Sequence, residues 1–487
     1  MSEAAYVRLS GLDHAFLHFE TPATYMHVAL TAIFDAGSLG RSDGGIEIER
    51  VRAHVASRLH LLPRYRQRLH YVPLTNDPVW VDDDAFEPEY HVRHSHLPRP
   101  GSEAQLKTLV SRILERPLDR KRPLWEMWFI EGLPGGRFAM LCKVHHCMVD
   151  GIAGIELLAA LLSPVPETRI ERPRPWSPQP LPAAAQLVRD ELRRRADASL
   201  GLVRGLSHVV ASAGRTGVGA RLGSLWGFLR SGVQNAASTP FNAPVGPHRR
   251  VEWLGFDLAE MKEIKKRLGG TLNDVVLATV TGAMRRYLGH HGASVEEGEF
   301  RALIPVSTRT TSDQGEPGNR VSAWIAPLPL DDSRPLERYD RICRLTSAYR
   351  DNHEERGAQV LTSTAEWTTA LPLAAAVRLI SKTRAFNVIV TNVPGPPVPF
   401  FLLDASMLTA YPHVPLFENQ GIGIALLSYA GKLYFGLVGE WDLLPDLDRL
   451  ASWVEASYAE LREAAGMPAP VARNERRLRR VGAQAVA

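Results

Sequence analysis

The chain has 487 residues, of which 45% are hydrophobic and 23% are charged, and these proportions exclude a largely disordered or collagen-like chain. Its 57 Lys and Arg residues against 53 Asp and Glu give a formal net charge of +4, far from the concentrated basic charge of nucleic-acid-binding proteins. Three cysteines lie in no CxxC or zinc-type spacing, and neither a secretory leader nor a run of about 18 apolar residues occurs. We therefore expect a cytoplasmic protein of two large or three smaller domains, with no metal site and no nucleic-acid partner.

The first half of the chain alternates predicted strands with predicted helices. Two β-prone runs joined by Gly135-Gly136 predict a hairpin, which leads into the segment HHCMVDG at residues 145–151. This segment is therefore expected on a strand-to-helix turn, where side chains stand at the rim of a rigid scaffold. The expected elements are a strand at Ala29–Phe34, helices at Ile46–Leu62 and Ala104–Leu114, strands at Trp125–Ile130 and Arg137–Val144, and a helix at Ile152–Leu162.

A change of composition ends the first domain. Seven prolines between Pro164 and Pro182 indicate an extended linker, and residues 183–228 have a helical composition. Between Ala198 and Val251 there are six arginines and no acidic residue. Two interpretations stay open: an amphipathic segment at a membrane surface, or helices that cross between domains with a solvated arginine face.

The second half alternates helices and strands again, although it shows no clean residue-level repeat of the first. Expected helices lie at Leu258–Leu268, Asn273–Leu288, Pro335–Asn352, Gln359–Arg384 and Pro445–Ala465, and expected strands at Phe300–Ile304, Val321–Leu330, Phe386–Val393, Gly421–Tyr429 and Lys432–Val438. The last two strands are joined at Ala430-Gly431 as a hairpin. The predicted organisation is an N-terminal domain at 1–163, a proline-rich and then basic helical connector at 164–250, a second domain at 251–468, and a charged tail at 469–487.

The segment HHCMVDG has the residue types that acyl transfer to an alcohol requires. A base must take the hydroxyl proton as the oxygen attacks, and an imidazole with an ordinary pKa of about 6.5 is largely neutral and basic at pH 7. Asp150 can pin the turn by pairing with a cation or a backbone N–H, and Gly151 permits a close backbone approach. Neighbouring residues at a strand end face opposite ways, so the spacing does not decide which of His145 and His146 points into a site. Taken alone, a histidine pair at a strand end is more often a packed or surface feature.

The pattern HHxxxDG resembles the active-site signature shared by chloramphenicol acetyltransferase, peptide-synthetase condensation domains and the wax ester synthase/diacylglycerol acyltransferases. By this resemblance the second histidine, His146, is the catalytic base, His145 supports it, and Asp150 is structural. Cys147, beside the base, is interpreted as a small packing residue because the implied transfer is direct and needs no covalent enzyme intermediate.

Further segments are similar to the wax ester synthase/diacylglycerol acyltransferase family in particular, and the resemblance covers roughly residues 9 to 465. They are Leu9–Val28, Tyr90–Arg93 with Leu97–Gly101, the PLWE motif Pro123-Leu124-Trp125-Glu126, the ND motif Asn273-Asp274, Pro305–Arg309, Gly318–Arg320, the NVPGP segment beginning at Asn392, and Ser428–Gly431. Each has a structural alternative: Asn273 as a helix N-cap, Pro394-Gly395 as an ordinary turn, and Trp125 as core packing. Two stretches, Gly436–Asp442 and Phe417–Ile424, depart from the family pattern, which leaves the acceptor preference open.

The resemblance implies an α/β (α+β) fold of two chloramphenicol-acetyltransferase-like domains, each a mixed sheet flanked by helices, with the active-site channel at their interface. Asn273, at the start of the ND helix, would lie opposite His146 and help to position substrate, with Asp274 and Asn392 as further candidates. The implied reaction is transfer of a long-chain acyl group from acyl-CoA to diacylglycerol or a long-chain alcohol, with no cofactor besides the acyl-CoA substrate. The implied setting is the cytoplasm, with peripheral association with the inner face of the cell membrane or with lipid droplets. Two alternatives are an acyltransferase that takes its donor from a carrier protein and a non-catalytic lipid-binding protein.

Overall fold

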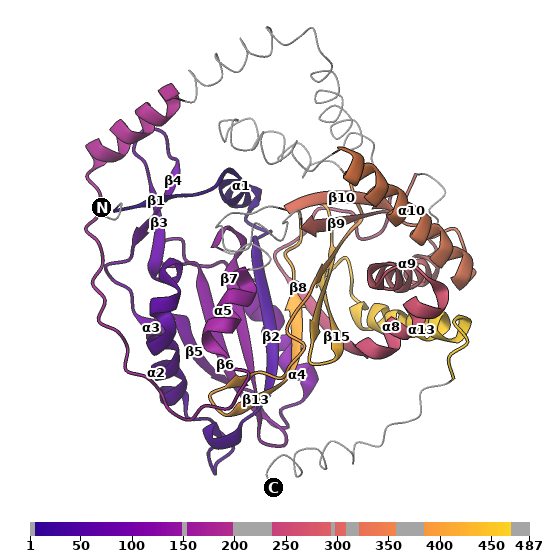
Figure 1. Cartoon of the computed structure of the whole chain (residues 1–487), viewed down its shortest axis with the longest axis horizontal. Coiled ribbons are helices and arrows are strands. Elements are labelled where there is room, and N and C mark those ends of the chain that lie inside the picture. Colours follow the sequence, from indigo (N-terminus) through magenta and orange to yellow (C-terminus); the bar gives the residue numbers. More distant parts are fainter. Residues whose placement is uncertain are drawn as a thin grey trace.

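Two six-stranded sheets stand next to each other in the computed structural model, each with helices against it (Figure 1). The structure describes residues 5–148, 153–197, 236–293, 298–307, 321–356 and 384–468. The first sheet has the order β12 (Phe401–Leu402), β13 (Ala405–His413), β2 (His27–Asp35), β7 (Arg137–His145), β6 (Trp125–Leu133) and β5 (Val92–His96). The second has the order β10 (Val321–Pro327), β9 (Arg301–Ser307), β11 (Val388–Val393), β14 (Ile422–Tyr429), β15 (Lys432–Glu440) and β8 (Arg249–Asp257). Both sheets are mixed, since β5 pairs parallel with β6, and β11 pairs parallel with β9 and β14.

Helices pack against the sheets, and the two largest buried cores lie mainly one in each half. The labelled helices are α1 (Gly11–Phe19), α2 (Ile48–Arg58), α3 (Pro88–His91), α4 (Glu103–Leu114), α5 (Ala153–Leu161), α8 (Leu258–Leu268), α9 (Leu272–His290), α10 (Pro335–Arg356) and α13 (Leu447–Ala464), and a further helix spans residues 184–197. In the second half α9 is central: it is apolar on nearly every side and packs against α8, α10 and α13 (Figure 1). A helix that is buried on nearly every side needs other elements packed around it, which these three helices provide. The α/β architecture expected from the sequence is confirmed.

Most regular elements lie where the sequence pattern predicts them. Both hairpins are present, as β6 with β7 and β14 with β15. The helix expected at Ile46–Leu62 ends earlier, because α2 stops at Arg58 and a 3-10 turn at Leu59–Leu61 follows. The helix expected at Gln359–Arg384, the basic stretch at 198–235 and the charged tail at 469–487 lie outside the described residues, apart from Arg384 itself.

One crossing between the halves was not predicted. Strands β12 and β13 come from the second half of the sequence but extend the first sheet, where β13 pairs antiparallel with β2. Gly436 of β15 makes room for the crossing, since a Cβ there would lie 1.7 Å from the carbonyl oxygen of Pro412. His413 Nε2 is 2.9 Å from Thr31 Oγ1. The expected division into 1–163 and 251–468 therefore does not follow the sheets at residues 401–413, and β8 begins at Arg249, within the expected connector.

A small third sheet, also not predicted, carries a helix on its edge. Its strands are β1 (Val7–Arg8), β4 (Pro78–Asp82) and β3 (Gln67–Tyr71), and the helix spans residues 184–197. The buried carboxylate of Glu191 ties the helix to β1 through Arg8. It also pairs within the helix with Arg194 at 2.5 Å and with Arg195 at 2.7 Å. Burial by itself would raise the pKa of Glu191, but the three arginines outweigh it and lower that pKa to about 2.

This ion cluster predicts a pH-dependent contribution to stability. Because the folded-state pKa of Glu191 is depressed, its contribution is complete above the ordinary pKa of about 4.3 and is lost as the pH falls toward 2. Glu191→Gln is expected to lower the unfolding midpoint at pH 6, and the difference from the wild-type protein should narrow steadily between pH 5 and pH 3. Urea unfolding across this range measures it, and a difference that widens as the pH falls would contradict the assignment.

Among the described residues, no helix is both long and apolar enough to cross a bilayer.

Candidate active site

The two adjacent histidines stand where β7 ends and a 3-10 turn at His146–Met148 begins. The ladder between β2 and β7 runs to the pair His27 and His145, and the N–H of His146 then donates to the carbonyl oxygen of Met26 at 2.7 Å. The N–H of His145 donates to the carbonyl oxygen of Leu124 at 2.9 Å. Both backbones are thus fixed by neighbouring strand ends, and the turn gives the two side chains different surroundings.

The side chain of His145 is buried and locked in one orientation. Its Nδ1 accepts a hydrogen bond from the backbone N–H of Cys147 at 3.0 Å, and its Nε2 lies 3.1 Å from Glu20 Oε1. Because Nδ1 is an acceptor, the ring proton resides on Nε2, where it faces the carboxylate. His145 is only 1% exposed, so it is placed to hold the turn and not to meet a substrate.

Glu20, which sequence reasoning did not select, is the polar centre of this arrangement. Glu20 is the C-cap of α1. Its carboxylate accepts hydrogen bonds from Arg120 at 2.6 Å and from the N–H of Met26 at 2.9 Å, and it lies 3.1 Å from Nε2 of His145. Burial would raise the pKa of Glu20, but hydrogen bonds from His145, Arg120 and Met26 prevail and lower it. Arg120 also donates to the carbonyl oxygen of Leu17 within α1. The sequence signal that could have identified Glu20 is its position in the segment Leu9–Val28, which resembles the N-terminal segment of the family.

His146 differs from its neighbour, because the residue is partly accessible, although its Nδ1 atom is buried. It stacks on Phe16 of α1, with 3.8 Å between ring centroids and 20° between planes. Phe16 contacts Phe19 at 6.0 Å, and Phe19 in turn contacts Phe417, a residue of the second half, at 5.7 Å. We call Phe16, Phe19 and Phe417 the aromatic row. All three are half-buried, so a partly accessible apolar surface runs from His146 toward the second half.

The other titratable groups on this strand end are buried. Burial raises the pKa of the Cys147 thiol well above its ordinary value, which disfavours the nucleophilic thiolate. Burial, together with the nearby cations Lys143 and Arg249, lowers the pKa of His27 well below its ordinary range. Lys143 donates to the carbonyl oxygens of Ile113 and Arg116 at the end of α4, and burial lowers its pKa to about 8. Asp150 and Gly151 of the signature lie outside the described residues.

The PLWE motif lies at the start of β6, the strand that pairs with β7 next to the histidines. Trp125 is fully buried, donates from Nε1 to the carbonyl oxygen of Tyr65 at 2.8 Å, and stacks on His91 with 4.4 Å between centroids. Pro123 precedes it with its carbonyl oxygen accepting from the N–H of Trp125, and the side chain of Leu124 is buried. Glu126 pairs with Arg93 at 3.1 Å and accepts from Trp128 Nε1 at 2.9 Å. These contacts agree with the structural interpretation of Trp125.

Replacing Trp125 by phenylalanine should therefore reduce stability more than chemistry. The change leaves the Tyr65 carbonyl oxygen without its buried donor and creates a small cavity, so we expect a loss of about 2–4 kcal/mol in the free energy of unfolding. Denaturant unfolding measures the loss, and kcat of the folded fraction should stay within about threefold of wild type, since a barrier change below about 0.7 kcal/mol is expected. A normal unfolding midpoint with a collapsed kcat would instead place Trp125 in contact with substrate.

The ND motif begins α9, but its roles differ from those expected. The N-cap is Thr271, not Asn273: Thr271 Oγ1 accepts from the N–H of Asp274, and Asp274 Oδ2 accepts from the N–H of Thr271 at 2.6 Å. This reciprocal pair is a capping box, so the cap lies two residues before the one predicted. Asp274 is fully buried and also accepts from Thr346 at 2.7 Å, whereas Asn273 is half-buried in the first turn.

The NVPGP segment packs against the hairpin segment Ser428–Gly431, which also matched the family. The N–H of Gly395 donates to Ser428 Oγ at 3.0 Å, and a Cβ at Gly395 would lie 2.2 Å from the carbonyl oxygen of Ser428. A side chain at 395 is therefore excluded by close approach and not by a turn alone. Asn392 is half-buried near the end of β11, in register with Leu426.

Glu440, in the stretch that departs from the family pattern, is the last residue of β15 and is buried. Its carboxylate accepts hydrogen bonds from the N–H groups of Asp442 and Leu443, so it has a structural role at the end of this strand.

Within the part of the chain that the structure describes, no group of three or more His, Cys, Asp and Glu side chains could hold a metal ion. The described site thus consists of a locked histidine, a partly accessible histidine and an apolar aromatic surface.

Comparison with known proteins decides which family this arrangement belongs to. The family model "Wax ester synthase/diacylglycerol acyltransferase catalytic domain" matches residues 9–276, and the model "WS/DGAT C-terminal domain" matches residues 317–462. The chain belongs to the wax ester synthase/diacylglycerol acyltransferase family. This acyltransferase is 35% identical over 474 residues to a putative diacylglycerol O-acyltransferase of Mycobacterium tuberculosis CDC 1551, with 94% of this chain and 91% of the relative covered. It is 33% identical to a probable diacylglycerol O-acyltransferase of M. tuberculosis H37Rv, with 93% and 95% covered.

Solved structures of this family and of condensation domains have a fold similar to that of this acyltransferase. The wax ester synthase/diacylglycerol acyltransferase from Marinobacter aquaeolei VT8 matches with a TM-score of 0.70 and 26% identity, over 95% of this chain and all of that one. The first condensation domain of the calcium-dependent antibiotic synthetase matches with a TM-score of 0.56 at 15% identity, over 96% of this chain and 98% of that one, which shows a shared fold alone. The predicted family and fold class are confirmed.

Proposed function

We propose that the protein transfers a long-chain acyl group from acyl-CoA to the free hydroxyl of diacylglycerol, with His146 as the general base. His146 would take the hydroxyl proton while the oxygen attacks the thioester carbonyl carbon. The carbon–sulfur bond then breaks, and the CoA thiolate recovers the proton from His146, so that the base is regenerated. The observation that carries this proposal is the difference between the neighbours: His145 is locked against Glu20, and His146 is partly accessible on the aromatic row.

The division of roles between the histidines follows from their contacts. A base has to approach the hydroxyl to about 3 Å, which a side chain that is 1% exposed does not permit. His145 instead keeps the turn rigid through the N–H of Cys147, and Glu20 keeps His145 in the required tautomer. Asp150 and Gly151 would hold the following part of the turn, as the family resemblance implies.

The aromatic row supports a long acyl or alkyl chain as the group bound beside the base. Each buried methylene contributes about 0.8 kcal/mol, so an apolar surface favours long chains over acetyl. Phe417 lies in the stretch Phe417–Ile424, which departs from the family pattern, and it contacts Phe19 from the other half. We therefore expect this stretch to influence which acceptor binds, diacylglycerol or a long-chain alcohol that would yield a wax ester.

Asn273 is proposed to position substrate from the second half of the site. It is half-buried and free of the N-cap role, which Thr271 fills, so its amide is available for another purpose. Asn273→Ala is expected to lower kcat/KM about tenfold, the loss of one hydrogen bond to a substrate. The matched control is Thr271→Ala, which removes the cap and should cost about 1 kcal/mol of stability with little change in kcat/KM. Equal turnover in Asn273→Ala and wild type would remove Asn273 from the site.

One assay tests the reaction and the acceptor together. Purified protein is supplied with labelled palmitoyl-CoA and, in parallel, with diacylglycerol or hexadecanol, and the products are separated by lipid chromatography. Label in triacylglycerol supports the proposal, and label in wax ester would add the second acceptor. Activity that appears only with an acyl group loaded on a carrier protein would reject acyl-CoA as the donor, and no transfer in any arm would favour a lipid-binding role.

The proposed setting is the cytoplasm, with the protein associated peripherally with the inner face of the cell membrane or with lipid droplets, because diacylglycerol resides there and not in water.

A further inference from the structure

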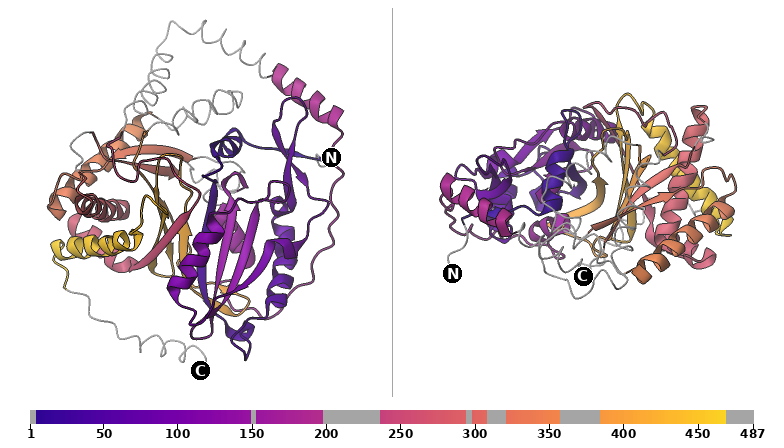
Figure 2. Two further views of the ribbon diagram at one scale, coloured as in Figure 1. Left: turned by 180° about the vertical axis from the view of Figure 1, so that it is seen from behind. Right: turned by 90° about the horizontal axis from the view of Figure 1, so that it is seen from above.

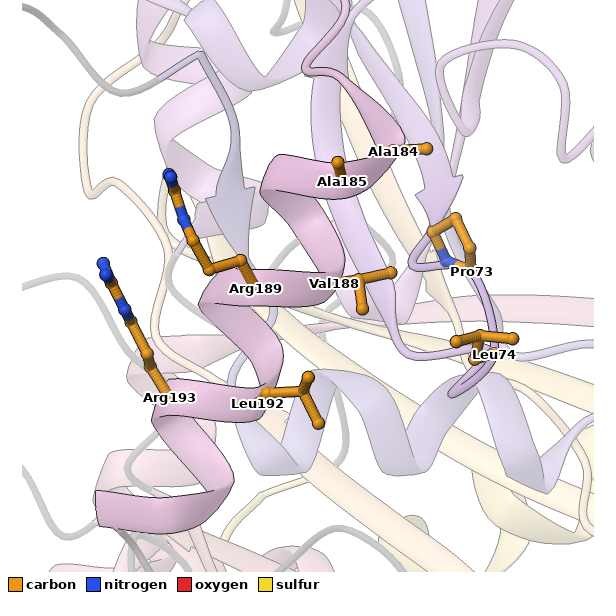
Figure 3. A pocket seen from close by; sticks show the side chains of 8 residues that line it. All are labelled: Pro73, Leu74, Ala184, Ala185, Val188, Arg189, Leu192 and Arg193. Atoms are coloured by element: carbon orange, nitrogen blue, oxygen red, sulfur yellow. The ribbon is translucent and has the colours of Figure 1, made fainter.

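An open apolar groove lies between the helix at residues 184–197 and the turn that joins β3 to β4 (Figure 3). It has a volume of about 520 Å³, and none of its lining residues belongs to the sheet that carries the histidines. Its apolar lining comes from Pro73, Leu74, Ala184, Ala185, Val188 and Leu192. Arg189 and Arg193 also line it, and their guanidinium groups extend on the side of the helix away from Pro73 and Leu74 (Figure 3). The eight described residues that line it include no acidic side chain.

The turn presents a leucine to the solvent at the cost of backbone strain. Leu74 is 94% exposed and has a φ of 69°, in the left-handed region that leucine rarely adopts. The turn is held closed by the N–H of Val72, which donates to Asp77, and by the N–H of Asn76, which donates to Val72. A strained position of this kind is maintained by the surrounding structure, and here it carries an exposed apolar side chain.

The helix has one face anchored to the protein and another face left open. Leu187 is buried, and Glu191 ties the inner face to β1 through Arg8. Residues 185, 188, 189, 192 and 193 have the spacing of a single helical face and all line the groove. On this face Leu192 is 61% exposed, Arg189 reaches Asp190 at 3.5 Å, and Arg193 forms no ion pair with a described residue.

We propose that this groove, with Leu74 and Leu192 as inserting side chains and Arg189 and Arg193 as headgroup contacts, docks the protein onto an anionic lipid bilayer. Apolar side chains flanked by arginines match a membrane interface, where leucine enters the acyl region and the guanidinium groups remain with phosphates. The inference rests on the proposed function in one respect: an enzyme that takes diacylglycerol has to meet it in a membrane. The helix and the tips of β3 and β4 lie at the same end of the molecule as α1, which packs on His146 (Figures 1 and 2). A bilayer at this end would therefore meet the face of the protein nearest the base.

The positive charge of Arg189 and Arg193 favours binding to an anionic bilayer and disfavours binding to a second copy of the chain. Two copies meeting through this face would bring four arginines together. Arg189 has an acidic neighbour in Asp190, but Arg193 has no ion pair with a described residue, so like charges oppose such a contact. Phosphates of anionic lipids neutralise the same arginines.

Flotation of the full-length protein with vesicles tests the surface directly. The vesicles are phosphatidylcholine alone or phosphatidylcholine with phosphatidylglycerol, and the variants are Leu74→Ser/Leu192→Ser and Arg189→Gln/Arg193→Gln. The leucine variant is expected to lose vesicle partitioning about tenfold or more on both compositions. The arginine variant should lose the preference for phosphatidylglycerol and retain the weaker binding to phosphatidylcholine.

Matched controls separate the surface from general apolar exposure. Leu336→Ser/Leu408→Ser removes two exposed leucines elsewhere, each 41% exposed, and should float like wild type. Thermal melts should show all variants folded, and turnover of a short, water-soluble alcohol should be unchanged, whereas turnover of diacylglycerol within vesicles should fall with flotation. Flotation needs no catalysis, so failure of the surface and failure of the proposed function are distinguishable. Equal flotation of wild type and the leucine variant, no flotation of the wild-type protein, or a dimer that the leucine substitutions dissociate without changing flotation would each overturn the proposal.

Discussion

Replacing His146 with alanine is expected to lower kcat for acyl transfer to diacylglycerol by about 10²- to 10⁴-fold, the range typical for loss of a general base. The substitution removes the group proposed to take the hydroxyl proton, while the backbone N–H of residue 146 still donates to Met26. Because His146 is only partly buried, its loss should cost less stability than the loss of the buried His145. Initial rates with labelled palmitoyl-CoA, together with a thermal melt, separate the two effects.

The neighbouring histidine supplies the contrast for this experiment. His145→Ala removes a buried ring that bonds to Glu20 and to the N–H of Cys147, so its melting temperature should fall along with its rate. His146→Ala should instead melt near the wild-type temperature and be nearly inactive. Full activity in His146→Ala would exclude the proposed base, whatever the behaviour of His145.

Replacing Glu20 with alanine is expected to destabilise the protein by about 3–5 kcal/mol, because it leaves three hydrogen-bonding partners, two of them buried, without their acceptor. Those partners are His145, Arg120 and the N–H of Met26. The rate should also fall about ten- to a hundredfold, as for other residues that orient a functional group, since His145 loses the contact that fixes its tautomer. Glu20→Gln keeps an oxygen that accepts from Nε2 of His145 and should recover part of both losses.

The pH dependence of stability distinguishes Glu20 from an ordinary packing residue. Its folded-state pKa is lowered, so its stabilising contribution is present above the ordinary value of about 4.3 and disappears as the pH falls below it. The stability difference between wild type and Glu20→Gln should therefore shrink between pH 6 and pH 3. The matched control for the rate is Glu126→Gln, which changes another buried glutamate, on β6, that pairs with Arg93. This substitution should leave kcat nearly unchanged. A normal rate for Glu20→Ala at full stability would contradict the positioning role.

The sequence predicts the elements whose pattern is local. The hairpin of β6 and β7 follows from alternating apolar residues around a glycine pair, and the position of the histidines at its end follows from chain order. The N-cap of α9 was misplaced, because Asn273 and Thr271 are both good capping residues and the choice depends on the reciprocal bond from Asp274.

Features that depend on distant parts of the chain could not be predicted. Glu20 is 125 residues from His145 in the sequence, and a single glutamate after a helix carries no local sign of a buried partner. Strand β13 pairs with β2 across more than 370 residues, and its register is set by the sheet it joins. Which histidine is accessible also depends on tertiary packing, namely on α1 and its Phe16.

The crossing of β13 has a consequence for how the protein is made. Strand β2, which lies between β7 and β13, gains its second neighbour after residue 413 has been synthesised. Until then a ribosome-bound chain that already contains both histidines would have β2 as an open sheet edge, a place where chaperones bind or chains aggregate. A stop codon anywhere before β12 should therefore yield insoluble fragments in place of an independent N-terminal domain, and the catalytic strand would complete its sheet late in translation.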